Sequence, residues 1–245
     1  MGYPEYQQGK IALIFATLFA PPRRYQHDDW AKYSYKNADE AHRLYRSQID
    51  IYRRLVEEHP DKFEIIRNTL DLNLLLSKWQ DAEEKHPHPT GMVLLMEGAE
   101  GIRSPEELEE WWGLGLRIIG PAWVGTRYCG GWHEPGPLTN EGRELLAAMA
   151  DYNFTLDLSH MDEVATLEAL DIYEGAIIAS HSNAAALLPN SGTNRHLSDR
   201  VIRGIIERDG VVGTVLFNAF LQVGWKKTDG REHITLEHLV AHIDH

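Results

Sequence analysis

Met92-Val93-Leu94-Leu95-Met96 is an uninterrupted apolar run that ends at Glu97-Gly98. A short apolar run between polar residues is typical of a β-strand that is buried on both faces. Runs of the same kind recur along the chain at Ile11–Phe19, Phe63–Ile66, Leu116–Ile119, Thr155–Leu158, Ala176–Ala179 and Val211–Phe217. Because these runs lack the alternation of a half-exposed strand, we expect each to be a strand covered on both sides.

Amphipathic helical patterns separate these runs, and several have recognisable ends. The clearest patterns cover Ala38–Glu58, Asn140–Asp151, Asp199–Asp209 and Leu236–His242. Thr139 and Ser198 precede two of them, and both residue types favour the N-cap position. Ser104 followed by proline predicts a further helix start.

Alternation of strand and helix predicts the fold class. Such alternation is typical of an α/β protein with a parallel sheet and helices outside it. We expect a (β/α)8 barrel of the TIM type in a single domain over residues 1–245, incomplete because about seven βα units are visible. A doubly wound open sheet is the alternative. No G-x-G-x-x-G or Walker A sequence supports that alternative.

Composition excludes several classes of function. The 245 residues carry a formal net charge of −13, which disfavours nucleic-acid or anionic membrane partners. The single cysteine, Cys129, excludes an internal disulfide and has no obvious activating base, so we expect no nucleophilic role. Ile11–Ala20, at ten residues, is too short to span a bilayer. A buried strand is favoured there over a signal-peptide core, and a cytoplasmic location is favoured without being established.

Metal-binding residue types follow three of the apolar runs. Glu97 follows the first, His160 follows Thr155–Leu158, and His181 follows Ala176–Ala179. In a parallel barrel all three would lie at the carboxyl ends of the strands, the face that carries catalysis. One carboxylate and two imidazoles suit zinc or a similar divalent ion, although a single histidine at a strand end is more often structural.

Several motifs between Glu97 and about Phe220 resemble the membrane dipeptidase (renal dipeptidase) family of zinc peptidases. In order along the chain they are Met96-Glu97-Gly98, Leu114-Gly115-Leu116-Arg117, Leu138-Thr139-Asn140-Glu141-Gly142, Asp157-Leu158-Ser159-His160, Ser180-His181-Ser182 and Arg195-His196-Leu197-Ser198-Asp199. The spacing of the two histidines, 181 − 160 = 21 positions, is also similar to that of the family. Weaker similarity extends over most of the chain.

The resemblance implies a metal-dependent dipeptidase and assigns its residues. Glu97 matches the catalytic carboxylate that bridges two zinc ions, and His160 and His181 match ligands of one of them. Arg195 matches the arginine that holds the terminal carboxylate of a dipeptide; a solvated loop arginine is the alternative. The implied reaction is attack by a zinc-bridging hydroxide on the peptide bond, with tolerance of a D-residue at the second position.

Departures from the family pattern leave other outcomes open. The family's His-x-Asp pair on its first strand has no counterpart. His27 with Asp29 lies in a polar loop after the Ile11–Phe19 run, and His242 with Asp244 lies in a helical pattern, so neither pair stands at the end of an initial strand. Two zinc ions are expected from the family, whereas this chain could hold one or none. The alternatives are therefore a mononuclear hydrolase or a truncated, non-catalytic member.

Two further expectations concern the substrate and the assembly. Trp123 stands where the family has a substrate histidine, in the Gly- and aromatic-rich segment 121–133. We expect this segment to be a loop that forms a substrate wall; a packed loop without that role is the alternative. Tryptophan has an N–H donor but is neither a general acid nor a general base. An incomplete barrel exposes strand edges, so we also expect a homo-oligomer, with marginal stability of the fold as the alternative.

Overall fold

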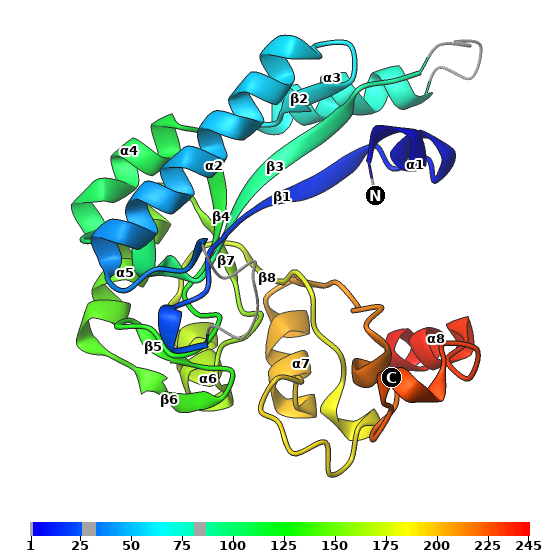
Figure 1. Cartoon of the computed structure of the whole chain (residues 1–245). Coiled ribbons are helices and arrows are strands. Elements are labelled where there is room, and N and C mark those ends of the chain that lie inside the picture. Colours follow the sequence, from blue (N-terminus) through cyan, green and yellow to red (C-terminus); the bar gives the residue numbers. More distant parts are fainter. Residues whose placement is uncertain (1, 26–32, 81–86) are drawn as a thin grey trace. The chain divides into compact units, whose positions relative to one another are not determined.

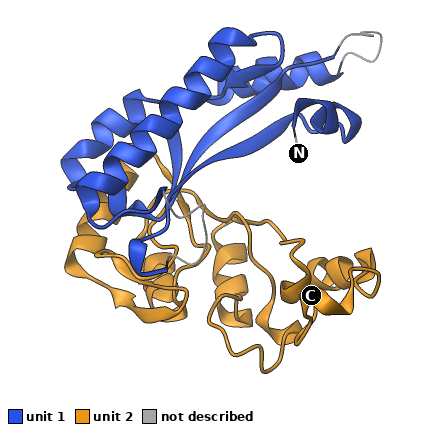
Figure 2. Cartoon of the chain, in the orientation of Figure 1, with its two compact units in different colours: residues 1–119 blue, residues 120–245 orange. Residues whose placement is uncertain are grey.

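The computed structural model describes residues 2–25, 33–80 and 87–245. The chain consists of two compact units: unit 1 covers Met1–Ile119, and unit 2 covers Gly120–His245 (Figure 2). No helix among the described residues combines the length and the apolar character needed to cross a membrane. The expectation of a single domain stays a prediction.

Unit 1 is organised around one long central strand, β3. Its elements are α1 (Tyr3–Gln8), β1 (Leu13–Phe19), α2 (Ala38–Glu58), β2 (Phe63–Ile65), α3 (Thr69–Gln80), β3 (Thr90–Glu97), α4 (Leu108–Gly113) and β4 (Leu116–Gly120), whose last residue begins unit 2 (Figure 1). β1 runs parallel to β3 in register from Leu13↔Gly91 to Phe19↔Glu97. β2 pairs in parallel with the first residues of β3, and β4 also lies next to β3.

Helix α2 ties down the carboxyl ends of β1 and β3. Tyr52 donates its hydroxyl to Thr17 O at 2.9 Å. The Gln48 amide makes two hydrogen bonds of 2.8 Å, accepting from Phe19 N and donating to Phe19 O. The fully buried Tyr45 donates to Gly98 O at 2.9 Å. One long helix thereby fixes Gly98, which follows Glu97, and the end of β1, which pairs with Glu97.

Unit 2 contains a second set of parallel strands. Its elements are β5 (Cys129–Gly131), β6 (Glu134–Leu138), α5 (Asn140–Asp151), β7 (Thr155–Asp157), α6 (Glu163–Ile172), β8 (Ile177–Ala179), α7 (Asp199–Glu207), β9 (Val211–Val212) and α8 (Leu236–Asp244) (Figure 1). β7 pairs with β8 in parallel, and β8 pairs with β9 in parallel. The carboxyl ends of β7 and β8 therefore lie side by side.

The expected alternation of strand and helix is confirmed. Each of the apolar runs contains a strand, and α2 and α5 have the bounds that the patterns predicted. Thr139 Oγ1 accepts from Gly142 N at 3.0 Å and Ser198 Oγ from Val201 N at 3.3 Å, as N-caps do. Ser104 differs, because it precedes a 3-10 turn at Pro105–Glu107 and its side chain makes no cap hydrogen bond.

The expectation that every strand is buried on both faces was wrong for the outer strands β1 and β9. Phe15 of β1 is half-exposed, and Val211 and Val212 of β9 are exposed. β9 pairs with β8, and the structure describes no further strand of unit 2 beyond it. Apolar sequence favours a strand, but its burial depends on neighbours that a single run does not reveal.

Segment 121–133 is not a simple loop. β5 pairs antiparallel with β6 through Cys129↔Leu138 and Gly131↔Glu134. The two strands approach so closely that a Cβ atom on Gly130 would lie 2.1 Å from the backbone nitrogen of Gly136. Only glycine fits at that contact, so the glycines that indicated a loop instead permit a tight hairpin.

Candidate metal centre

His160 lies in a turn directly after β7. Its φ of 69° is in the left-handed region, where a residue other than glycine is uncommon. Met161 N donates to Leu158 O at 3.2 Å and so closes the turn. The turn leaves His160 only 7% exposed. An unusual backbone conformation therefore sets the direction of this imidazole.

His181 follows β8 and meets His160. The two Nε2 atoms lie 2.8 Å apart, with the ring planes inclined at 59°. Two imidazole nitrogens at this distance need a proton or a cation between them, because two lone pairs would repel each other. Nitrogen ligands about 2.0–2.1 Å from a tetrahedral zinc lie roughly 3.3 Å apart, so a small ring rotation would accommodate the ion.

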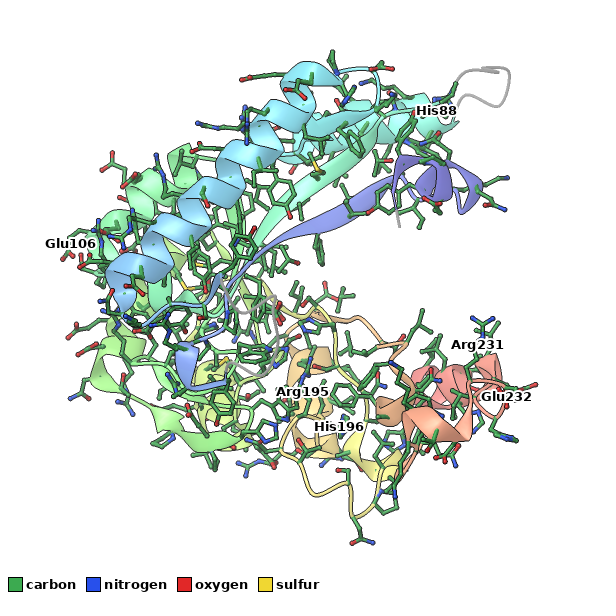
Figure 3. All side chains as sticks on the ribbon, viewed as in Figure 1. His88, Glu106, Arg195, His196, Arg231 and Glu232 are labelled. Atoms are coloured by element: carbon green, nitrogen blue, oxygen red, sulfur yellow. The ribbon has the colours of Figure 1, made fainter. Side chains whose placement is uncertain are left out.

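Arg195 is buried beside the two histidines. It is 3% exposed, which rules out the solvated loop arginine. Its Nη1 donates to Ser182 Oγ at 3.0 Å, and its Nη2 donates to His181 O at 2.6 Å. Nη2 also lies 3.2 Å from Nε2 of His160. Arg195 therefore has a fixed position next to the candidate ligands, on the segment that precedes α7 (Figure 3).

Two tryptophans flank His160. The ring centroid of Trp123 lies 6.3 Å from that of His160, and the centroid of Trp132 lies 6.0 Å from it. Trp132 is held by a 2.8 Å hydrogen bond from its Nε1 to Thr193 Oγ1. The aromatic segment therefore packs against the candidate ligand, and the substrate wall stays a prediction.

A buried carboxylate that the sequence reasoning missed joins the ends of β7 and β8. Asp157 is 1% exposed, and its Oδ1 accepts from Ser159 N at 3.0 Å and from Ser180 N at 2.9 Å. Buried charges of this kind are retained only when they are hydrogen-bonded. The available signal was an Asp-x-Ser-His sequence facing a Ser-His sequence on the next strand.

Glu97 is the last residue of β3 and is half-buried. Gly98 follows it with a φ of 83°, a value that glycine adopts readily. Glu97 belongs to unit 1, whereas His160, His181 and Arg195 belong to unit 2. Its use together with the two histidines is therefore a proposal.

The weaker candidates have other roles or lie outside the described residues. His27 and Asp29 fall in the segment that the structure does not describe. His242 is buried in α8, where its Nδ1 accepts a 3.2 Å hydrogen bond from Ala184 N. Burial raises the pKa of the Cys129 thiol to about 12, so it stays protonated at neutral pH and the expectation of a non-nucleophilic cysteine holds.

His196, next to Arg195, is expected to make stability depend on pH (Figure 3). Within the described chain its two ring nitrogens are buried without a hydrogen-bond partner, and the ring packs edge-on against Phe220. Burial, then the charges of Arg195 and His242, lower its pKa from 6.5 to about 4. Between these values the unfolded chain binds a proton that the folded chain does not, so stability falls as the pH drops through this window.

Thermal unfolding of the wild type and of His196→Leu between pH 7.5 and about 4 checks this effect. We expect the midpoint of the wild type to fall more steeply with acidification than that of the variant. His233→Ala, at an exposed histidine of the same unit, should keep the wild-type slope. Parallel profiles for the wild type and His196→Leu would remove His196 as the cause.

The whole chain is similar to one known family. The model of the family "Membrane dipeptidase (Peptidase family M19)" matches residues 1–245. The chain belongs to this family. Membership agrees with the resemblance of the motifs. The family consists of metallopeptidases, which are hydrolases.

Individual proteins are also similar to this chain. An uncharacterized protein in the PQQ-III 3' region of Acinetobacter calcoaceticus is 31% identical over 252 residues, which cover 95% of this chain and 75% of that protein. The dipeptidase tcpJ of Claviceps purpurea is 26% identical over 207 residues, covering 81% of this chain and 44% of that protein. The chain therefore spans less than half the length of this second relative.

A solved structure shows the fold. The metallo peptidase from Rhodobacter sphaeroides, liganded with a phosphinate mimic of the dipeptide L-Ala-D-Ala, superposes with a TM-score of 0.81 at 24% identity. The match covers 100% of this chain and 72% of that protein. An α/β fold of the incomplete TIM-barrel type is thus confirmed for this M19 member.

Proposed function

We propose that this M19 member is a zinc metallodipeptidase that hydrolyses the peptide bond of dipeptides. The observation that carries the proposal is the meeting of His160 and His181 at their Nε2 atoms, 2.8 Å apart. A buried arginine, Arg195, lies against both residues and supplies a positive charge that attracts a carboxylate. Family membership supplies the reaction class.

Glu97 would complete the ligand set. Glu97 ends β3, just as His160 and His181 follow β7 and β8, and each of the three residues has a side chain that can offer one ligand atom. A glutamate with two imidazoles is a donor set found in catalytic zinc sites, which keep a further position open. The motif position of Glu97 supports the bridging role, since a carboxylate has two oxygens to share between ions.

Zinc, when bound, would supply a hydroxide nucleophile near neutral pH and polarise the scissile carbonyl. Residues of the chain would bind the substrate and shield the site. Arg195 binds the C-terminal carboxylate of the dipeptide and thereby fixes the distance of its peptide bond from the histidines. Trp123 and Trp132 cover His160 and exclude water, and the indole of Trp123 can donate a hydrogen bond but transfers no proton.

Metal stoichiometry separates this proposal from its alternatives. Since the family's His-x-Asp pair has no counterpart, a chain with two zinc ions must find ligands elsewhere. A single zinc ion would favour a mononuclear hydrolase built on the Glu97, His160 and His181 set. A chain that retains no zinc and hydrolyses nothing would be the non-catalytic member.

Zinc content and hydrolysis of L-Ala-D-Ala by the full chain test the proposal together. We expect at least one zinc ion per chain, release of alanine, loss of activity with a chelator and its return with added zinc. The L,L-dipeptide and the tripeptide L-Ala-D-Ala-D-Ala serve as controls, and the tripeptide should be a poor substrate. A chain that binds no zinc and cleaves neither dipeptide would contradict the proposal.

Two other expectations remain proposals. A homo-oligomer is supported by the exposed apolar residues Val211 and Val212 on β9. A cytoplasmic location stays a proposal that rests on interpreting the apolar segment Ile11–Ala20 as a strand, and strand β1 covers Leu13–Phe19 of it.

A further inference from the structure

A hydrogen-bond network of three groups, the Asp157 carboxylate, the Ser180 hydroxyl and the His181 imidazole, connects β7 to the candidate ligand. Asp157 Oδ2 accepts a 2.5 Å hydrogen bond from the hydroxyl of Ser180. The same Ser180 oxygen lies 2.7 Å from Nδ1 of His181. Ser159 Oγ supports the arrangement by accepting from His181 N at 3.0 Å and lying 3.3 Å from Ser180 Oγ.

The number of protons shared by Asp157, Ser180 and His181 determines which group donates each hydrogen bond. Ser180 has one hydroxyl proton, and the carboxylate of Asp157 can only accept, so the proton points to Asp157. The Ser180 oxygen is then an acceptor toward Nδ1 of His181, which must carry a proton. In a neutral imidazole the other nitrogen, Nε2, is left with its lone pair. Nε2 is the atom that faces Nε2 of His160.

We propose that Asp157 and Ser180 are positioning residues that hold His181 in the Nδ1-protonated form, with the lone pair of Nε2 directed at the metal. The inference rests on the proposed function, because it gives His181 the role of a zinc ligand. Zinc-binding histidines commonly donate their second nitrogen to a carboxylate or carbonyl. Here a serine hydroxyl stands between the imidazole and the carboxylate.

The two ends of Asp157 can be separated by mutation. Oδ1 holds two backbone N–H groups, and that acceptor survives in Asp157→Asn as the amide oxygen. The amide NH₂ would then face Ser180 and donate to it, so the serine would donate to Nδ1 of His181. This reversal would leave the proton on Nε2, the wrong nitrogen for the metal. Asp157→Asn therefore reverses the donor and acceptor roles in this hydrogen-bond network while keeping its shape.

Zinc affinity, measured by competition with a chelator, tests the proposal without using activity. Removing an outer partner of a ligand typically costs 10- to 100-fold in metal affinity. We expect about a 10-fold loss for Ser180→Ala and about a 100-fold loss for Asp157→Asn, whereas Ser180→Thr, which keeps the hydroxyl, should stay near the wild type. Ser191→Ala, at an exposed serine of the same unit, is the matched control.

Nitrogen-15 NMR of histidine-labelled, metal-free protein gives a second readout. We expect the proton of His181 on Nδ1 in the wild type and on Nε2 in Asp157→Asn. Thermal unfolding of each variant shows whether the fold is retained. Wild-type zinc affinity in folded Asp157→Asn and Ser180→Ala, or an Nε2 proton in the wild type, would overturn the positioning role.

Failure of the proposed function would look different. His181→Ala measures the contribution of the ligand itself to zinc affinity. If His181→Ala binds zinc as the wild type does, the metal site is wrong, and the positioning role is overturned with it. If His181→Ala loses affinity while Ser180→Ala and Asp157→Asn do not, the metal site stands and only the positioning role fails.

Discussion

Replacing either His160 or His181 with alanine is expected to remove bound zinc and dipeptide hydrolysis together. Each substitution takes away a nitrogen whose partner lies 2.8 Å away, so the remaining imidazole has no second donor there. Losing a direct ligand should cost more than losing an outer partner, which puts the fall in zinc affinity above about 100-fold. Hydrolysis of L-Ala-D-Ala should fall below detection in both variants.

The control for both variants is an exposed histidine of the same unit. His233→Ala removes an exposed imidazole outside the candidate ligand set, and it should keep the zinc content and activity of the wild type. Zinc content by mass spectrometry and rates at saturating zinc are the measurements. Full activity in either His160→Ala or His181→Ala would remove that residue from the ligand set.

Arg195→Lys is expected to raise the KM for dipeptides by about 10- to 100-fold with a smaller effect on kcat. Hydrogen bonds to charged groups contribute about 1.5–3 kcal/mol, and the lysine ammonium lacks the planar fork that matches a carboxylate. Arg195→Ala should also destabilise unit 2, because Ser182 Oγ and His181 O would lose their buried donor. The lysine variant is therefore the cleaner test.

A dipeptide amide provides the matched substrate control for Arg195. The amide lacks the terminal carboxylate, so the wild type should bind it poorly, and Arg195→Lys should reduce its use little further. The interaction shows as non-additivity between the enzyme change and the substrate change. Equal losses for the acid and the amide would mean that Arg195 acts only on the structure of the site.

Local patterns predicted most of the regular structure. The bounds of α2 and α5 follow from apolar stripes and N-caps, which are local signals. The β5–β6 hairpin was not predicted, because the close approach of Gly130 to Gly136 is a tertiary contact. The exposure of Val211 has the same origin, since burial depends on which strand comes next. Sequence periodicity carries no information on such contacts.

The sequence indicated the two candidate histidines but not the groups that contact them, and their use as metal ligands stays a prediction. His160 and His181 end apolar runs, a position that a parallel sheet makes functional, and the structure brings them together. Asp157 lies inside an apolar run and looked like a strand residue. Its hydrogen bonds depend on the pairing of β7 with β8, which places Ser180 beside it.

Diffraction at the zinc absorption edge from crystals of the full chain grown with zinc tests the metal site most directly. An anomalous peak about 2.0–2.2 Å from Nε2 of His160, Nε2 of His181 and a carboxylate oxygen of Glu97 is the result expected here. A well-ordered crystal with no peak at these atoms, or with zinc bound only by other residues, would contradict the metal site and the dipeptidase built on it.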